Sequence, residues 1–142
     1  ARHASYWATL KLRPGATGVV TDACVPMTEL PGQVAAADAD MMAAGIMGDI
    51  VGHVGDGNFH TLMLVEPGNA GEIATAKRIA RRMADRAIAV GGTISGEHGI
   101  GVGKRDLMLD QHGEACAVMS AIKRALDPNN IMNPGKLLPD FN

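Results

Sequence analysis

The feature that most restricts the fold is a pair of apolar segments separated by Gly55-Asp56-Gly57. Residues 46–65 are otherwise rich in strand-forming residues, and Asp-Gly between two such runs is a strong short-range signal of a β-hairpin. If Asp56 and Gly57 are the two central residues of a tight turn, His53 lies directly opposite His60. The sequence therefore predicts two antiparallel strands that place two imidazoles side by side.

The remaining periodicity predicts helices that cover this hairpin. Asn69 with Glu72 three residues later is a helix-start pattern, and apolar residues then recur at helical spacing until Gly91-Gly92. A short strand is expected over 19–25, and helices over 1–12, 34–44 and 114–126. The order β-α-β-β-α, followed by more helix, predicts an α+β fold with a ferredoxin-like antiparallel sheet and helices packed on one face.

Composition excludes several classes of function. The 142 residues suit one domain, and no apolar stretch approaches the ~18 residues that a membrane span needs. The net charge of -2 comes from acidic and basic residues spread along the chain, so neither nucleic acid nor anionic lipid is indicated as a partner. Cys24 and Cys116 form no CxxC pair, which argues against a disulfide framework or a thiolate zinc site and favours a reducing compartment.

Two motifs carry the chemistry. The opposed histidines His53 and His60 could converge on one cation, and the glycine-rich segment 95–104 adds the adjacent pair Glu97-His98. A set of His53, His60 and Glu97 would suit zinc first, or manganese or iron, and would leave positions open for a substrate. His98 would then be free to act as a general base. Alternatively, the histidines are surface residues of a hairpin and the glycines form an anion-binding loop; Asp56 is assigned to the turn.

At these motifs the chain resembles the C-terminal domain of FAD-linked oxidases of the vanillyl-alcohol-oxidase type, especially the branch that contains cytochrome-linked D-lactate dehydrogenases and glycolate oxidase. The resemblance covers nearly the whole chain. It rests on an ordered set of segments: residues 1–8, 22–26, 52–60, 96–101 with Lys104, and 126–136.

The resemblance implies roles residue by residue. His53, His60 and Glu97 match metal ligands, and His98 matches the catalytic base. Asn58 and Asn133 match positions that line the flavin, and Arg2 resembles the arginine that pairs with the substrate carboxylate, although an exposed helix residue is an equal alternative. The implied enzyme uses FAD and a divalent metal to oxidise a D-2-hydroxy acid, D-lactate in the first place, by proton transfer to His98 and hydride transfer to the flavin, which an external electron acceptor reoxidises.

The same resemblance implies that the chain is a truncated piece of such an enzyme. A separate N-terminal domain would make most of the contacts with FAD, so the 142 residues alone are not expected to be active. Exposed strand edges would favour self-association as a homo-oligomer.

We expect a cytoplasmic or peripherally membrane-associated protein, mitochondrial if eukaryotic. The rival hypothesis is a non-catalytic metal-binding or assembly domain related to these enzymes; a purely structural domain would leave Glu97-His98 unexplained.

Overall fold

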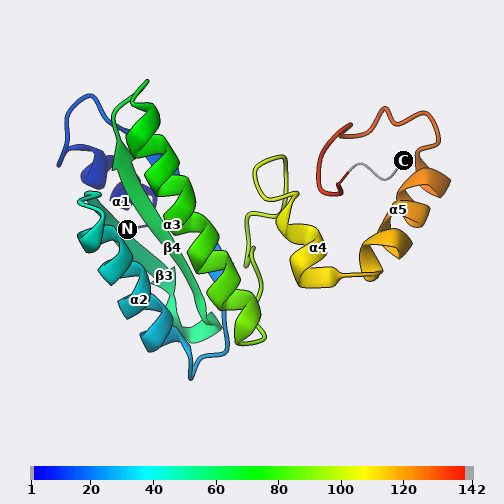
Figure 1. The fold of residues 1–142 in the computed structure, drawn as a ribbon, viewed down its shortest axis with the longest axis horizontal. Helices are drawn as coiled ribbons and strands as arrows, with labels where there is room; N and C mark the ends of the chain where they lie inside the picture. Colours follow the sequence, from blue (N-terminus) through cyan, green and yellow to red (C-terminus); the bar gives the residue numbers. More distant parts are fainter. Residues whose placement is uncertain (1, 140–142) are drawn as a thin grey trace. The chain divides into compact units, whose positions relative to one another are not determined.

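The computed structural model describes residues 2–139, and the chain divides into two compact units, Ala1–Gly96 and Glu97–Asn142. The first unit contains helices and strands in the order α1 (Arg2–Leu10), β1 (Thr17–Val20), β2 (Ala23–Cys24), α2 (Leu30–Ala43), β3 (Gly48–His53), β4 (Asn58–Val65) and α3 (Ala70–Ala89) (Figure 1). The second contains α4 (Leu107–His112) and α5 (Ala115–Leu126). The predicted order β-α-β-β-α and the mixed α+β class are confirmed, with the strand expected over 19–25 divided into β1 and β2.

The long strand β4 is the centre of the antiparallel sheet. It pairs with β3 on one side and with both β1 and β2 on the other. The pairs Thr17–Val65 and Ala23–Phe59 belong to one register, so β1 and β2 are two parts of one strand interrupted at residues 21 and 22. The amide of Thr21 still donates to the carbonyl of Thr61 at 3.0 Å, which shows that the register continues through the interruption.

Alternation along β4 divides its side chains between two faces. Phe59, Met63 and Val65 point to one face, where they pack with apolar residues of α2 and α3 such as Met83 and Ile79. These side chains form the core of the unit, and all eight residues of β4 are buried. Helices α2 and α3 therefore cover one face of the sheet, as predicted (Figure 1).

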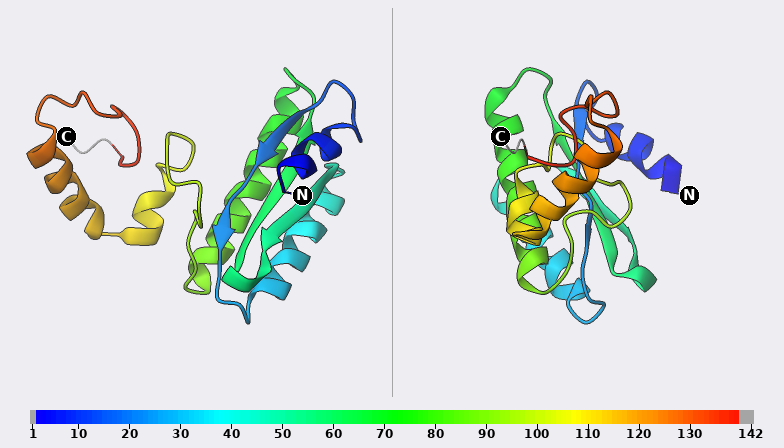
Figure 2. Two further views of the ribbon diagram at one scale, coloured as in Figure 1. Left: turned by 180° about the vertical axis from the view of Figure 1, so that it is seen from behind. Right: turned by 90° about the vertical axis from the view of Figure 1, so that its right-hand side faces the viewer.

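The opposite face is covered in part by α1, which contacts β1, β3 and β4 and lies in front of the sheet in the rear view of Figure 2. A Cβ on Gly18 would lie 2.4 Å from Leu62 Cδ1 and 3.1 Å from the ring of Tyr6, so α1 packs closely at this end. The same face carries Asn58 and His60 toward the other end of β4, because they alternate with the core residues. Helix α1 packs at the Gly18 end of this face, and residues 93–96 pack at the end that carries Asn58.

An ion pair fixes the connection after α1 to the beginning of α3. Arg13 donates from Nη1 to Glu72 Oε2 at 2.7 Å and from Nη2 to Glu72 Oε1 at 3.0 Å. These bonds, with a further one from the amide of Glu66, lower the pKa of Glu72. Asn69 Oδ1 accepts from the amide of Glu72 at 3.1 Å, which confirms the predicted start of this helix.

The hairpin between β3 and β4 has a wider turn than the sequence predicts. Residues Val54–Asp56 form a short 3-10 helix, and Gly57 has a left-handed φ of 72°. His53 therefore pairs with Asn58 and His60 with Val51, and the predicted direct pairing of His53 with His60 is wrong. The register shifts by two residues, so both histidines keep the same face, as diagonal neighbours whose Cα atoms typically lie about 7–8 Å apart.

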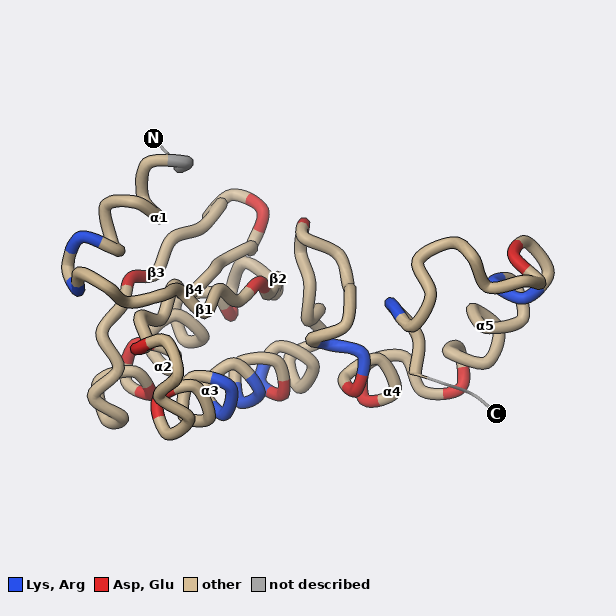
Figure 3. Tube along the Cα trace, turned by 90° about the horizontal axis from the view of Figure 1, so that it is seen from above, with Lys and Arg blue, Asp and Glu red and all other residues tan. Residues whose placement is uncertain are grey.

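In the second unit, α4 is followed closely by α5. Cys116 is fully buried, and its thiol donates to the carbonyl of Met108 at 3.3 Å. Asp127 ends α5: it pairs with Lys123 and accepts from the amides of Ile131 and Met132 at 3.0 and 2.9 Å, contacts that lower its pKa. Acidic and basic residues are interspersed along the described elements (Figure 3).

Candidate metal and substrate site

A buried carboxylate lies where β1 and β2 are interrupted. Asp22 is 5% exposed, and its Oδ1 accepts from Asn58 Nδ2 at 2.9 Å while its Oδ2 accepts from Ser95 Oγ at 2.9 Å. From the sequence, Asp22 was placed in a strand and in a segment of the family resemblance, but was assigned no role in the site. The only sequence signal is the polar pair Thr21-Asp22 within an otherwise apolar strand, and this signal does not identify the contacts of Asp22 with Asn58 and Ser95.

His60 is oriented by the same interruption. It is 4% exposed, and its Nδ1 lies 3.1 Å from the carbonyl oxygen of Thr21 and 3.6 Å from Asp22 Oδ1. A carbonyl oxygen can only accept a hydrogen bond, so the geometry requires the proton on Nδ1. In the neutral ring this tautomer gives Nε2 the lone pair, which is the arrangement of a metal-binding histidine held by a backbone carbonyl.

The segment after α3 continues along the polar end of the sheet. Thr93 pairs with Cys24 through two backbone hydrogen bonds of 3.0 and 2.7 Å. A Cβ on Gly96 would lie 1.8 Å from Asn58 Nδ2, so only glycine fits at this position. Residues 93–96 therefore lie along the polar end of the sheet, directly before Glu97 and His98 in the sequence.

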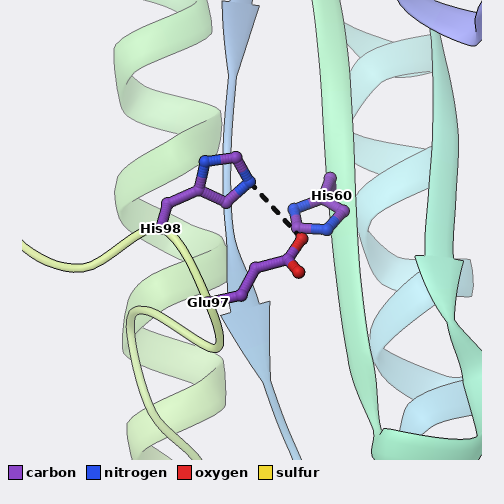
Figure 4. A group of neighbouring side chains, drawn as sticks. All are labelled: His60, Glu97 and His98. Carbon is purple, nitrogen blue, oxygen red and sulfur yellow. Dashed lines mark ion pairs between the residues drawn. The ribbon is translucent and has the colours of Figure 1, made fainter. Parts of the chain in front are cut away.

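The possible ligand atoms of His60, Glu97 and His98 all lie within 4.8 Å of one another. Figure 4 shows the three side chains pointing toward each other, with His98 Nε2 3.5 Å from Glu97 Oε1. Two imidazoles and a carboxylate are the donor types that zinc, manganese and iron accept. Glu97 and His98 directly follow Gly96, which packs against Asn58, a neighbour of His60 on the same face of β4.

The structure brings together some of the predicted site residues and not others. His60 and Glu97, predicted as ligands, are joined by His98, predicted as the base, whereas His53 does not belong to the group. His53 is half-buried and lies at the end of β3 on the same face. The roles of all four remain predictions.

Asn58 and Asn133 lie in different units. Asn58 is 5% exposed, and its Oδ1 has no hydrogen-bond partner among residues 2–139. Asn133 is exposed, has a φ of 46°, and lines a cavity of about 930 Å³ between α5 and residues 128–139. Arg2 begins α1, and its side chain lies outside the described residues.

No helix among the described residues is long and apolar enough to cross a membrane. In comparisons with known proteins, residues 1–137 match the family model of FAD linked oxidases, C-terminal domain. The chain is 46% identical over 139 residues to a probable mitochondrial D-lactate dehydrogenase of Danio rerio, covering 97% of this chain and 28% of that protein.

Two further relatives show the same pattern. A mitochondrial cytochrome D-lactate dehydrogenase of Arabidopsis thaliana is 37% identical, with 97% of this chain and 24% of that protein covered. The glycolate oxidase subunit GlcD of Bacillus subtilis is 36% identical, with 96% and 29% covered. The chain spans only about a quarter of the length of these relatives. The match over residues 1–137 nevertheless shows that the chain belongs to the family of FAD linked oxidases, as their C-terminal domain.

Proposed function

We propose that the chain is the substrate-oxidising part of an FAD-dependent dehydrogenase that converts a D-2-hydroxy acid, D-lactate in the first place, to the 2-oxo acid. The observation that carries the proposal is the convergence of His60, Glu97 and His98 in a member of this family. The names of the relatives, which include D-lactate dehydrogenases and a glycolate oxidase subunit, support a small 2-hydroxy acid as the substrate.

The donor set fits a divalent metal. His60 offers Nε2 because its Nδ1 is turned to the Thr21 carbonyl, and Glu97 offers a carboxylate within reach of it. When bound, zinc, or alternatively manganese or iron, would polarise the 2-hydroxyl and a carboxylate oxygen of the substrate and so lower the pKa of that hydroxyl. His53, which lies opposite Asn58 on the same face of the sheet, would supply a third ligand.

His98 has the position of a general base in this proposal. It neighbours Glu97, whose carboxylate lies 3.5 Å from His98 Nε2 and would stabilise the ring once it has taken the proton of the 2-hydroxyl. The side chain of His98 is about half exposed, so an imidazole that gains a proton there can release it to solvent. Arg2 would bind the substrate carboxylate through its planar guanidinium group.

One buried group at the polar end of the sheet supports a contact with the flavin. Asn58 Oδ1 is a buried acceptor with no hydrogen-bond donor within residues 2–139, and it matches the N–H groups of such a ring. When bound, FAD would accept the hydride from C2 of the substrate and pass its electrons to an external acceptor. Asn133, with its left-handed backbone, would be a second contact to the cofactor. The names of the D-lactate dehydrogenase relatives support a mitochondrial location if the protein is eukaryotic.

The experiment that tests this proposal is an anaerobic stopped-flow measurement of FAD reduction in the intact protein by D-lactate, L-lactate, glycolate and D-2-hydroxyglutarate. We expect fast bleaching with D-lactate and none with L-lactate. His98→Ala should slow reduction by about 10²–10⁴-fold with the metal retained, because the base is lost. A protein that binds metal but reduces no flavin with any of the four acids would instead support a non-catalytic metal-binding or assembly domain.

A further inference from the structure

Asp22 is a buried charged residue, and the packing of the sheet alone does not explain why a charge is present there. Its carboxylate lies on the polar end of the sheet, opposite His60 in the continued β1–β2 register, and is only 5% exposed. A carboxylate is costly to bury unless hydrogen bonds or nearby positive charge compensate it. A neutral asparagine would have the same shape without that cost, so the negative charge itself requires an explanation.

The hydrogen bonds of Asp22 reach the two site residues of β4. Asn58 Nδ2 donates to Asp22 Oδ1 at 2.9 Å. This bond turns the amide oxygen of Asn58 away from Asp22, because an amide oxygen and a carboxylate oxygen are both acceptors and repel each other. The same Oδ1 lies 3.6 Å from His60 Nδ1, beyond hydrogen-bond range but close enough for a strong electrostatic effect in a buried environment. Ser95 Oγ holds the other oxygen at 2.9 Å and so fixes the plane of the carboxylate.

We propose that Asp22 is a positioning residue of the metal site, which holds Asn58 and the Nδ1-protonated form of His60 so that His60 Nε2 is presented as a ligand. This inference rests on the proposed function, because it assigns a supporting residue to the same site. The buried negative charge of Asp22 also favours a cation at the group formed by His60, Glu97 and His98. Asp22 does not touch the substrate and is not a catalytic residue.

The test compares Asp22→Asn with a matched control in the intact protein. Asp22→Asn keeps the shape of the side chain and removes its charge. The control, Asp49→Asn, makes the same change at an exposed carboxylate on the same face of the sheet, opposite Leu62. Supporting interactions of this kind typically contribute 10–100-fold to metal affinity. We expect zinc to bind 10–100-fold more weakly to Asp22→Asn, and within about 3-fold of wild type to Asp49→Asn.

A second readout does not depend on metal. Nitrogen-15 chemical shifts of His60 in the metal-free protein report which ring nitrogen carries the proton, and we expect protonated Nδ1 in wild type and a mixture of tautomers in Asp22→Asn. Equal zinc affinity of wild type and Asp22→Asn would overturn the inference, as would protonated Nε2 in the metal-free wild type. If wild type binds no zinc, the proposed metal site fails, and the tautomers alone decide whether Asp22 orients His60. Circular dichroism and the melting temperature identify a variant that has lost its fold.

Discussion

Replacing Gly57 with alanine should destabilise the first unit more than any other single methyl group added to the hairpin. Gly57 has a φ of 72°, and a left-handed backbone costs a residue with a Cβ roughly 1–2 kcal/mol. The new Cβ would also lie 2.0 Å from the carbonyl oxygen of Val25, a backbone atom that a side-chain rotation cannot move away. Relieving such an overlap typically costs about 1–3 kcal/mol. The two effects together predict a loss of about 2–5 kcal/mol.

Gly55 provides the matched control, since it lies in the same turn. Its φ is outside the left-handed region, and an added Cβ would meet nothing within 4 Å. Gly55→Ala should therefore be neutral or should stabilise by about 0.4–1 kcal/mol, through loss of freedom in the unfolded chain. Urea unfolding followed by circular dichroism measures both free energies. A difference between the two variants of less than about 0.5 kcal/mol would show that neither the left-handed φ of Gly57 nor the overlap with Val25 limits this turn, because each effect alone should exceed it.

Three further predictions concern α3 and its contacts. Asn69→Ala should lose about 1 kcal/mol in urea unfolding, because the helix loses the acceptor that caps it, whereas Lys77→Ala on the exposed surface of α3 should change stability by less than about 0.5 kcal/mol. Ile79→Ala should cost about 2–5 kcal/mol, since the side chain is 1% exposed in the core; a smaller loss would show that the core collapses around the cavity. The bond from Arg13 lowers the pKa of Glu72 in the folded state, so its stabilising contribution is present above the ordinary glutamate pKa and is lost as the pH falls through the lowered value. The difference in unfolding free energy between wild type and Glu72→Gln should therefore shrink as the pH is lowered from 6 to 3, and a constant difference would contradict the assignment.

The sequence predicted most of the fold because its signals were local. The start of α3 at Asn69 and the two strands on either side of Gly57 follow from capping and turn chemistry within a few residues. The type of turn could not be predicted in the same way. The carbonyl of Gly57 accepts a hydrogen bond from the amide of Val25 at 2.9 Å, and this contact with a distant segment fixes a four-residue loop where a two-residue turn was expected.

The candidate site was predicted only in part for the same reason. His60, Glu97 and His98 were recognisable from their residue types and their glycine-rich surroundings, but their grouping depends on the path of residues 92–96. Asp22 contacts Asn58 and Ser95, residues 36 and 73 positions away in the sequence, and no local pattern predicts these contacts. The wider turn then shifted His53 by two positions relative to His60.

Elemental analysis of the purified protein shows whether His60 belongs to a metal site. Wild type, His60→Ala and His112→Ala are compared after equilibration with zinc, with His112 as a control because it lies in α4 and is not one of the predicted ligands. We expect about one equivalent of metal in wild type and in His112→Ala, and none in His60→Ala. Equal metal content in wild type and His60→Ala would show that His60 is not a ligand.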